Sequence, residues 1–262
     1  MPERFDRRVR IQSGPVTLSS EDVEIEGRVT FTEDWVDDVS RLVVQNLSQG
    51  TISSLSDQQT LSVEAGYEGD TGVILEGRVR SVSTTTKGND DKTVILVGSG
   101  VRDFQDSYVS ESFLNAIGPQ QLIQQMVQRI PTVQIGQVDV QGDPYDHHTV
   151  ARSAYNEVDG LRRDFDRVAY MRDLSVYVED PDRVYGGRER ILRPGGILNS
   201  IRRGYSRERD EEAVIIETQL SQSLFVGATV TVQQGRLSGT YRVVSGGHSL
   251  TDHTTDVVGV EV

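Results

Sequence analysis

The sequence has no cysteine, almost no lysine, few aromatic residues and no long apolar run, and each shortage excludes a class of structure. Without cysteine there are no disulfides, no thiol chemistry and no cysteine zinc sites. No apolar run approaches the roughly 20 residues of a membrane-spanning helix, so we expect no membrane insertion. The charged first ten residues lack the apolar core of a signal peptide, and we expect a subunit that is made in the cytoplasm.

The scarcity of lysine is the most unusual feature of the charge. Of the 27 basic side chains only Lys87 and Lys92 are lysine, and the formal net charge is −13. Arginine is weakly hydrated and forms bidentate pairs, whereas lysine is a strongly hydrated point charge. An acidic, lysine-poor surface suits molar salt, where the Debye length is about 3 Å. We favour a halophilic host; an ordinary acidic protein and a GC-rich genome that replaces lysine codons are the alternatives.

The first 100 residues read as a succession of short strands. Residues 61–82 contain two runs of alternating apolar and polar side chains, separated by the acidic, glycine-containing segment 68–72, and this predicts a hairpin. Gly77 lies within the second run, where it permits a sharp bend. Further strands are predicted at 9–13, 23–31, 39–45 and 93–97, with 46–57 as a loop or short helix and 84–91 as a polar turn. This spacing favours a sandwich or a barrel.

The pattern changes near Asp103. Residues 119–130 predict an amphipathic helix that begins with proline at its first position. A strand at 133–140, a second helix at 149–164 and a hairpin over 168–178 follow. After a charged connection, strands are predicted at 197–200, 213–219, 224–233, 241–245 and 257–262. A length of 262 residues suits two small domains, or one large β domain with an insertion.

Two segments resemble one protein family. Residues 46–79 (NLSQGTISSLSDQQTLSVEAGYEGDTGVILEGRV) resemble the N-terminal barrel of the tail-hub, or baseplate-hub, proteins of long-tailed phages and archaeal tailed viruses, the phage late control protein D-like family. Residues 226–250 resemble the last barrel of that family, with matching positions at Gly227, Gly239, Tyr241, Val243 and His248. Between the barrels the family has an insert with helices that ends in a hairpin.

The resemblance implies a mainly β fold with an α+β insert and two small barrels of the tail-hub type. The domains would be 1–105, the N-terminal barrel; 106–182, the insert with two helices and a hairpin; and 183–262, the second barrel. It implies a structural homotrimer at the distal end of a virion tail, with no enzymatic activity. The ring would adapt the sixfold tail tube to a threefold tip and leave a channel for DNA ejection.

The partners that the resemblance implies are other tail components. They are the tail tube or a distal adaptor protein, the tape-measure protein, and tail fibre or tip proteins. DNA would pass through the ring without sequence-specific contact. A tail-associated hydrolase and a receptor-binding β module are the alternative functions. The hydrolase needs convergent His and carboxylate groups in one cleft. The receptor module needs exposed aromatic platforms, but aromatic residues make up only 6% of the chain.

No residue pattern predicts a catalytic, cofactor-binding or metal site. Neither of the two clusters of histidine and aspartate has the spacing of a metal centre: Asp143, Asp146, His147 and His148; and His248, Asp252, His253 and Asp256. The acidic stretches 37–38, 89–91 and 180–182 lack EF-hand spacing and are interpreted as solvated turns. The sequence has no nucleophile elbow, Walker loop or dinucleotide fingerprint.

The densest basic cluster consists of Arg202, Arg203, Arg207 and Arg209. It is followed at once by the acidic residues Glu208, Asp210, Glu211 and Glu212. A nucleic-acid site would show unopposed positive charge. We therefore interpret this stretch as an ion-pair region between strands or between subunits.

Overall fold

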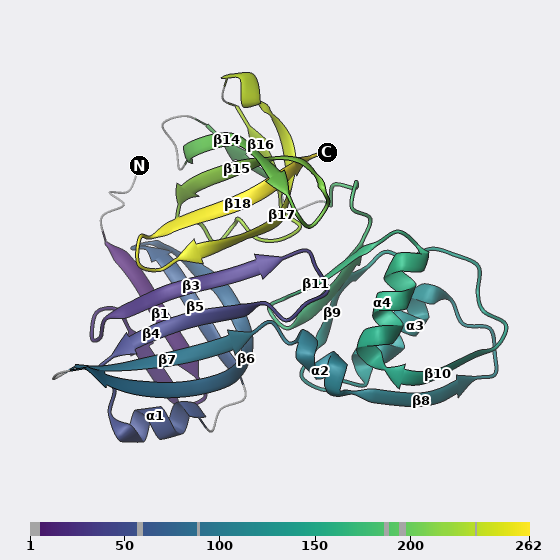
Figure 1. The fold of residues 1–262 in the computed structure, drawn as a ribbon, viewed down its shortest axis with the longest axis horizontal. Coiled ribbons are helices and arrows are strands. Elements are labelled where there is room, and N and C mark those ends of the chain that lie inside the picture. Colours follow the sequence, from purple (N-terminus) through teal and green to yellow (C-terminus); the bar gives the residue numbers. More distant parts are fainter. Residues whose placement is uncertain (1–5, 57–59, 88–89, 186–188, 194–197, 234) are drawn as a thin grey trace. The chain divides into compact units, whose positions relative to one another are not determined.

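The chain forms two compact units. The computed structural model describes residues 6–56, 60–87, 90–185, 189–193, 198–233 and 235–262 (Figure 1). The barrel unit comprises Met1–Thr32, Asp38–Gly98 and Val184–Val262. The insert unit comprises Ser99–Arg183 together with the short segment Glu33–Asp37. Most of the described regular structure is strand, so the predicted mainly β fold with an α+β insert is confirmed.

The barrel unit contains two curved β modules (Figure 1). The first module consists of β1 (Arg7–Ser13), β2 (Val16–Ser19), β3 (Ile25–Thr32), β4 (Val39–Gln45), α1 (Gln49–Ser56), β5 (Thr60–Tyr67), β6 (Asp70–Lys87) and β7 (Asp90–Gly98). The second consists of β13 (Glu189–Leu192), β14 (Leu198–Ser206), β15 (Glu211–Gln219), β16 (Thr229–Val232), the 3-10 turn η1 (Gly235–Leu237), β17 (Gly239–Ser249) and β18 (Thr254–Glu261). Each module wraps around its own apolar core.

One continuous sheet joins the two modules. Its strand order is β14-β15-β18-β17-β3-β4-β7-β6-β5-β1-β2, and β16 pairs with both β17 and β13. The junction is the antiparallel pairing of β3 with β17, in which Phe31 lies opposite Gly246 and Thr30 opposite Gly247. A Cβ atom on Gly247 would lie 2.5 Å from the Val29 carbonyl oxygen. This glycine therefore lets the backbones of β3 and β17 approach closely at the junction.

The predicted hairpin of residues 61–82 is the β5–β6 pair. The turn is shorter than predicted, because β5 ends at Tyr67 and β6 begins at Asp70. Gly66 has a φ of +155°, and a Cβ atom there would lie 2.2 Å from the Asp70 carbonyl oxygen. Leu61, Val63 and Ala65 are buried in the core of the first module, as their alternation predicts.

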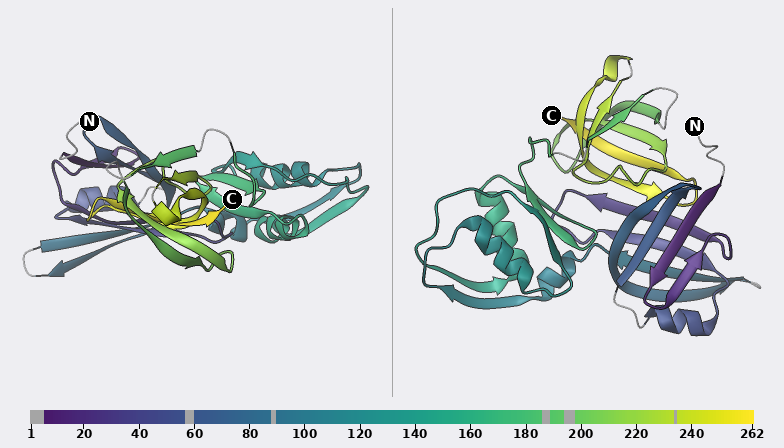
Figure 2. Two further views of the ribbon diagram at one scale, coloured as in Figure 1. Left: turned by 90° about the horizontal axis from the view of Figure 1, so that it is seen from above. Right: turned by 180° about the vertical axis from the view of Figure 1, so that it is seen from behind.

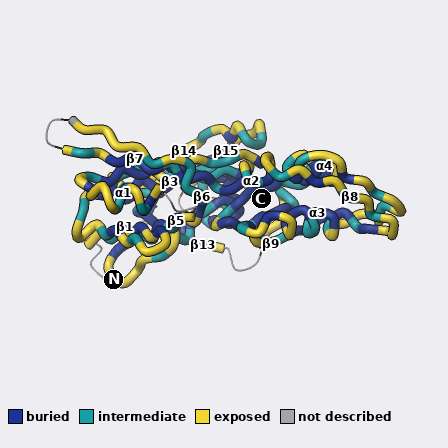
Figure 3. Tube along the Cα trace, turned by 90° about the horizontal axis from the view of Figure 1, so that it is seen from below, coloured by how far each residue is buried: buried dark blue, intermediate teal, exposed yellow. Residues whose placement is uncertain are grey.

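The insert unit places helices beside two small sheets. Its elements are α2 (Val101–Asp106), β8 (Tyr108–Phe113), α3 (Pro119–Gln128), β9 (Gln134–Val138), β10 (His148–Ser153), α4 (Ala154–Asp164), β11 (Val168–Arg172) and β12 (Ser175–Glu179). One sheet is the antiparallel pair β8–β10, and the other has the order β11-β12-β9. The apolar faces of α3 and α4 share a continuous core, visible as the dark segments of these helices in Figure 3. No described helix is long and apolar enough to cross a membrane.

Several element predictions are wrong in their bounds. The second helix begins at Ala154, because residues 148–153 pair with β8 and Ser153 caps the helix by accepting a hydrogen bond from the Asn156 amide. The turn predicted at 84–91 belongs largely to β6 and β7, since β-branched threonines favour extended backbone. Only 229–232 of the strand predicted at 224–233 is extended, and β2, α2, β8 and β13 were not predicted. Ile197 lies outside the described residues.

The compact units divide the chain at Gly98 and Arg183, and both β modules belong to the same unit. The assignment of domains to 1–105, 106–182 and 183–262 stays a prediction. The structure adds one unexpected element to the insert, the segment Glu33–Asp37 between β3 and β4.

Trp35, the only tryptophan, is part of the core of the insert unit. Its side chain is 1% exposed. The indole packs edge-to-face on Phe104 at a centroid distance of 5.2 Å and stacks on Tyr155 at 5.9 Å. The indole Nε1 donates a hydrogen bond to the Tyr155 carbonyl oxygen at 3.4 Å. A residue that is far away in sequence thus anchors α2 and α4.

We predict that Trp35→Ala lowers the free energy of unfolding by about 3–5 kcal/mol, because it leaves a large cavity between Phe104 and Tyr155. Urea unfolding followed by circular dichroism measures the change. The neighbouring Val36 is 46% exposed, and Val36→Ala serves as the matched control with an expected change within about 0.5 kcal/mol. Equal losses from the two substitutions would contradict the assignment of Trp35 to the core.

Candidate functional site

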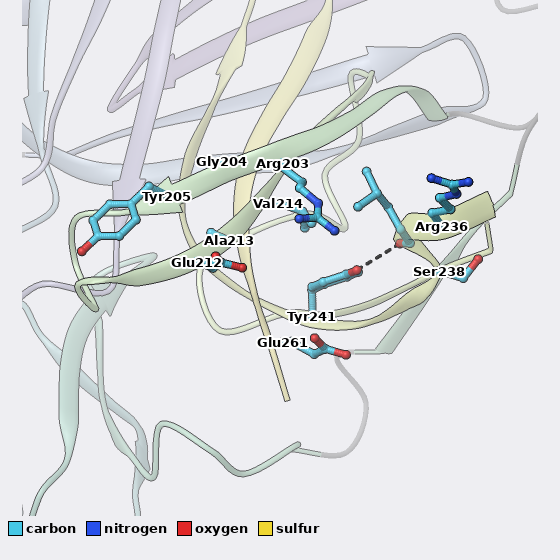
Figure 4. A pocket seen from close by; sticks show the side chains of 11 residues that line it. Arg203, Gly204, Tyr205, Glu212, Ala213, Val214, Arg236, Ser238, Tyr241 and Glu261 are labelled. Carbon is cyan, nitrogen blue, oxygen red and sulfur yellow. Dashed lines mark hydrogen bonds between the residues drawn. The ribbon is translucent and has the colours of Figure 1, made fainter.

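A hollow of the barrel unit lies at one end of the second module (Figure 4). It holds about 400 Å³, and β14, β15, η1, β17 and β18 contribute to its wall. Val214 and Tyr241 belong to the apolar core at its base. The Tyr241 hydroxyl donates a hydrogen bond to the Leu237 carbonyl oxygen at 3.0 Å, shown dashed in Figure 4. Burial, followed by the charge of Glu261, raises the pKa of Tyr241, so the hydroxyl stays protonated at neutral pH.

The lining of this hollow carries charges of both signs. Arg203 and Arg236 contribute guanidinium groups, and Glu212 and Glu261 contribute carboxylates. No histidine lines it, and the Ser238 hydroxyl already donates to the Gly235 carbonyl oxygen. A hydroxyl nucleophile needs a base that accepts its hydrogen bond, whereas the Ser238 hydroxyl donates to a backbone carbonyl. The arrangement suits contact with a polar surface better than covalent chemistry.

The basic cluster forms the β14–β15 hairpin beside this hollow. Tyr205 pairs with Glu212 across the ladder, and its hydroxyl donates to Asp210. That hydrogen bond, followed by burial, raises the pKa of Tyr205. In the turn, the Ser206 hydroxyl donates to Glu208 and accepts from the Arg209 amide. Hydroxyl groups therefore shape the hairpin, and its interpretation as an ion-pair region stays a prediction.

His248 is buried at the junction of the two modules. It lies opposite Val29 in the β3–β17 ladder and is 1% exposed. Its Nδ1 is 2.9 Å from the Thr255 hydroxyl oxygen, and the ring packs on Phe31 at a centroid distance of 5.3 Å. Burial lowers the pKa of His248 to about 4, whereas the charge of Asp256 acts in the opposite direction. The imidazole is therefore neutral at physiological pH.

The other members of this histidine and aspartate cluster have separate partners. The His253 Nε2 lies 2.8 Å from the Gly66 carbonyl oxygen. Asp252 accepts a hydrogen bond from the Ser249 hydroxyl, and Asp256 pairs with Arg28 at 2.7 Å. Neighbours in the sequence are thus directed to different parts of the barrel unit.

The cluster around His148 is organised by a residue that the sequence did not single out. Glu157 on α4 is 1% exposed and lies 2.9 Å from the His148 Nε2. Its second oxygen accepts a hydrogen bond from the Arg152 Nε at 2.6 Å. Glu157 comes four residues after Ser153, the residue that caps α4. Had the start of this helix been predicted at Ala154, the sequence would have placed Glu157 near its N-terminus. Asp143 and Asp146 are exposed and do not join this network as ligands.

Of the three acidic stretches predicted as turns, only 180–182 forms one. Asp90 and Asp91 instead begin β7, where they pair with β6, and 37–38 is an irregular segment that leads into β4. Asp37 accepts a hydrogen bond from the Gly100 amide at 3.0 Å, and Asp38 accepts one from the Thr32 amide at 2.9 Å. Asp180 accepts one from the Asp182 amide at 3.0 Å. Asn89 lies outside the described residues. Across the part of the chain that the structure describes, no three His, Asp or Glu side chains gather into a group that could hold a metal ion.

The fold is shared with proteins of phage tails and of a secretion system. No protein-family model and no curated protein sequence matches the chain. Among solved structures, the 43 kDa tail protein of prophage MuSo2 from Shewanella oneidensis superposes with a TM-score of 0.72 at 9% identity, over 98% of this chain and 97% of that one. A tail protein from Neisseria meningitidis MC58 gives a TM-score of 0.70 at 8% identity, over 97% and 96%.

A third similar structure comes from a different system. The c3393 protein of E. coli, a component of the type VI secretion system described as similar to the T4 tail proteins gp27 and gp5, gives a TM-score of 0.61 at 10% identity. The match covers 96% of this chain and 76% of that one. The chain therefore has the fold of these tail proteins, as the sequence resemblance implied.

We predict that His248 makes stability depend on pH. The folded-state pKa of about 4 lies below the unfolded value of about 6.5, so this contribution is present above pH 6.5 and is lost as the pH falls towards 4. We expect the free energy of unfolding to fall by about 3 kcal/mol from this group alone. Urea unfolding of the wild type and of His248→Gln at pH 7 and pH 4 isolates this term, because the carboxylates titrate in both chains. An equal pH dependence in the two proteins would contradict the prediction.

Proposed function

We propose that this chain is a structural hub protein at the distal end of a virus tail. The observation that carries the proposal is the extent of the shared fold, which spans nearly the whole of this chain and of two phage tail proteins. Both β modules and the insert are included in that match. The two segments that resemble hub barrels in sequence, residues 46–79 and 226–250, lie in the first and second modules respectively.

The hub would be a homotrimer that forms a ring. Each chain has two curved modules, so a trimer has six. Six similar modules would match the sixfold symmetry of the tail tube, while the trimer as a whole would match the threefold symmetry of the tip. The partners would be the tail tube or a distal adaptor, the tape-measure protein, and fibre or tip proteins. DNA would pass through the centre without base-specific contact, because acidic walls repel its phosphates.

The rival functions require groups that the described residues do not bring together. A tail-associated hydrolase needs a base and a nucleophile or metal in one cleft, but His148 is bound to Glu157 and His248 is buried against Thr255. A receptor-binding module needs exposed aromatic platforms. Tyr108 and Tyr205 are exposed, but they belong to different compact units and form no single platform within either.

The trimer can be tested by mass. We predict that the purified protein in molar potassium chloride has a mass of about 87 kDa, three times the 29.1 kDa of one chain. Light scattering coupled to size exclusion measures it across a dilution series. A species that stays at the mass of a monomer or a dimer at every concentration would refute the trimer.

Electron microscopy of the virion, which locates the chain on the tail axis or on a fibre, tests the hub position.

We predict that the thermal midpoint rises as potassium chloride increases from low to molar concentration. A trimer carries three times the net charge of −13 around one axis, and salt screens this repulsion. A variant with Glu24→Gln, Asp146→Asn and Glu211→Gln removes exposed carboxylates and is the matched control. Its midpoint should depend less on salt than that of the wild type. A wild-type midpoint that does not rise with salt would contradict the halophilic host.

A further inference from the structure

Among the residues that the structure describes, the strand β8 of the insert unit has one edge without a paired strand. There it pairs only with β10, in a two-stranded sheet. Tyr108 at the start of β8 is 70% exposed, and Leu114 just beyond its end is 76% exposed. A two-stranded sheet with a free edge is marginally stable alone and is a template for another strand.

Two hollows follow this strand. One holds about 480 Å³ and is lined by five successive residues, Ser107 to Glu111, together with Arg129. Because side chains of successive strand residues point to opposite faces, a hollow that touches all five runs along the backbone edge. The other holds about 540 Å³, between residues 112–117 and the glutamines on the outer side of α3.

These hollows carry almost no charge in a strongly acidic protein. No residue that lines the larger hollow is ionisable. In the smaller one, Glu111 and Arg129 neutralise each other as an ion pair. The glutamine amides and serine hydroxyls supply both donors and acceptors, which suits the polar groups of a peptide backbone. The β8 edge is therefore built for an uncharged extended segment.

The chain itself contains such a segment in the distal part of β6. Among the described residues, β6 pairs with β5 only as far as Arg78, whereas its pairing with β7 continues to Lys87. Residues 81–86 read Ser-Val-Ser-Thr-Thr-Thr, carry no charge and are exposed except for the half-buried Val82. Figure 2 shows this part of β6 and β7 as a hairpin that projects from its module. We call residues 81–86 the β6 arm.

We propose that the β6 arm of one chain pairs with the β8 edge of a second copy, and that this contact joins neighbouring subunits of the trimer. Two chains of charge −13 repel, so the stretches that can approach are those without net charge. The β6 arm has no charged residue, and the one carboxylate of β8, Glu111, is neutralised by Arg129. Each is six residues long and has one side unpaired among the described residues. A head-to-tail contact of this kind closes into a trimeric ring when each subunit is rotated by one third of a turn from the last. The inference rests on the proposed trimer.

The absence of cysteine makes the pairing directly testable by cross-linking. Chains of different tag length carrying Ser83→Cys and Ser110→Cys are mixed, unfolded, reassembled in molar potassium chloride and treated with a short bismaleimide. Both serines are exposed, so the changes are mild. We expect a covalent dimer that contains one chain of each length. The control pair replaces Ser83→Cys with Ser53→Cys on the exposed side of α1 and should give little product.

A charge pair provides the second measurement. We expect Ser110→Glu to shift the assembly towards monomer by placing a carboxylate at the edge, and the added Ser83→Lys to restore the trimer. Mixed cross-links that do not exceed the control, in a sample that is trimeric by mass, would overturn the pairing and leave the trimer standing. A sample that is monomeric by mass would overturn both the trimer and the pairing.

Discussion

The antiparallel ladder between β3 and β17 is the interaction on which the arrangement of the barrel unit depends. It spans Arg28–Thr32 and Ser245–Ser249, two segments more than 200 residues apart in sequence, and makes two curved modules into one sheet. The Gly27 carbonyl accepts a hydrogen bond from the Leu250 amide just beyond the ladder. Gly27 has a φ of +140°, and a Cβ atom there would lie 2.2 Å from the Arg41 carbonyl oxygen, so this position within β3 requires glycine.

The same ladder explains why a histidine is buried in the barrel unit. His248 fills a position where the two modules meet, and its hydrogen bond to Thr255 fixes the ring against β18. Arg28 reaches from β3 to Asp256 on β18, so an ion pair spans the junction on the surface. An exposed pair of this kind contributes little energy, and the buried backbone ladder and apolar packing hold the modules together.

Sequence patterns predicted the strands whose two faces differ and missed the elements defined by distant partners. Residues 61–67 alternate cleanly because one face is core, and they form β5 as predicted. Residues 149–153 were predicted to be helical because Val150 and Ala154 fit a helical spacing, but pairing with β8 decides their conformation. The parallel pairing of β13 with β16 and the burial of Glu157 likewise follow from tertiary contacts, which local sequence does not encode.

The distribution of charge in this chain matters more for assembly than its sum. The chain has 40 acidic side chains against 27 basic ones, and this excess keeps chains apart unless salt or local neutrality intervenes. Neutrality arises here in two physical ways: ion pairs such as Arg129 with Glu111, and runs of hydroxyl and amide side chains such as residues 81–86 and those of α3. Hydroxyl and amide side chains hydrate a strand edge in the free subunit. A subunit with such uncharged polar edges therefore stays in solution, whereas one with exposed apolar edges would aggregate. In an acidic subunit, contacts between copies can therefore form at a few neutral edges, because charge repulsion between the remaining surfaces disfavours other contacts.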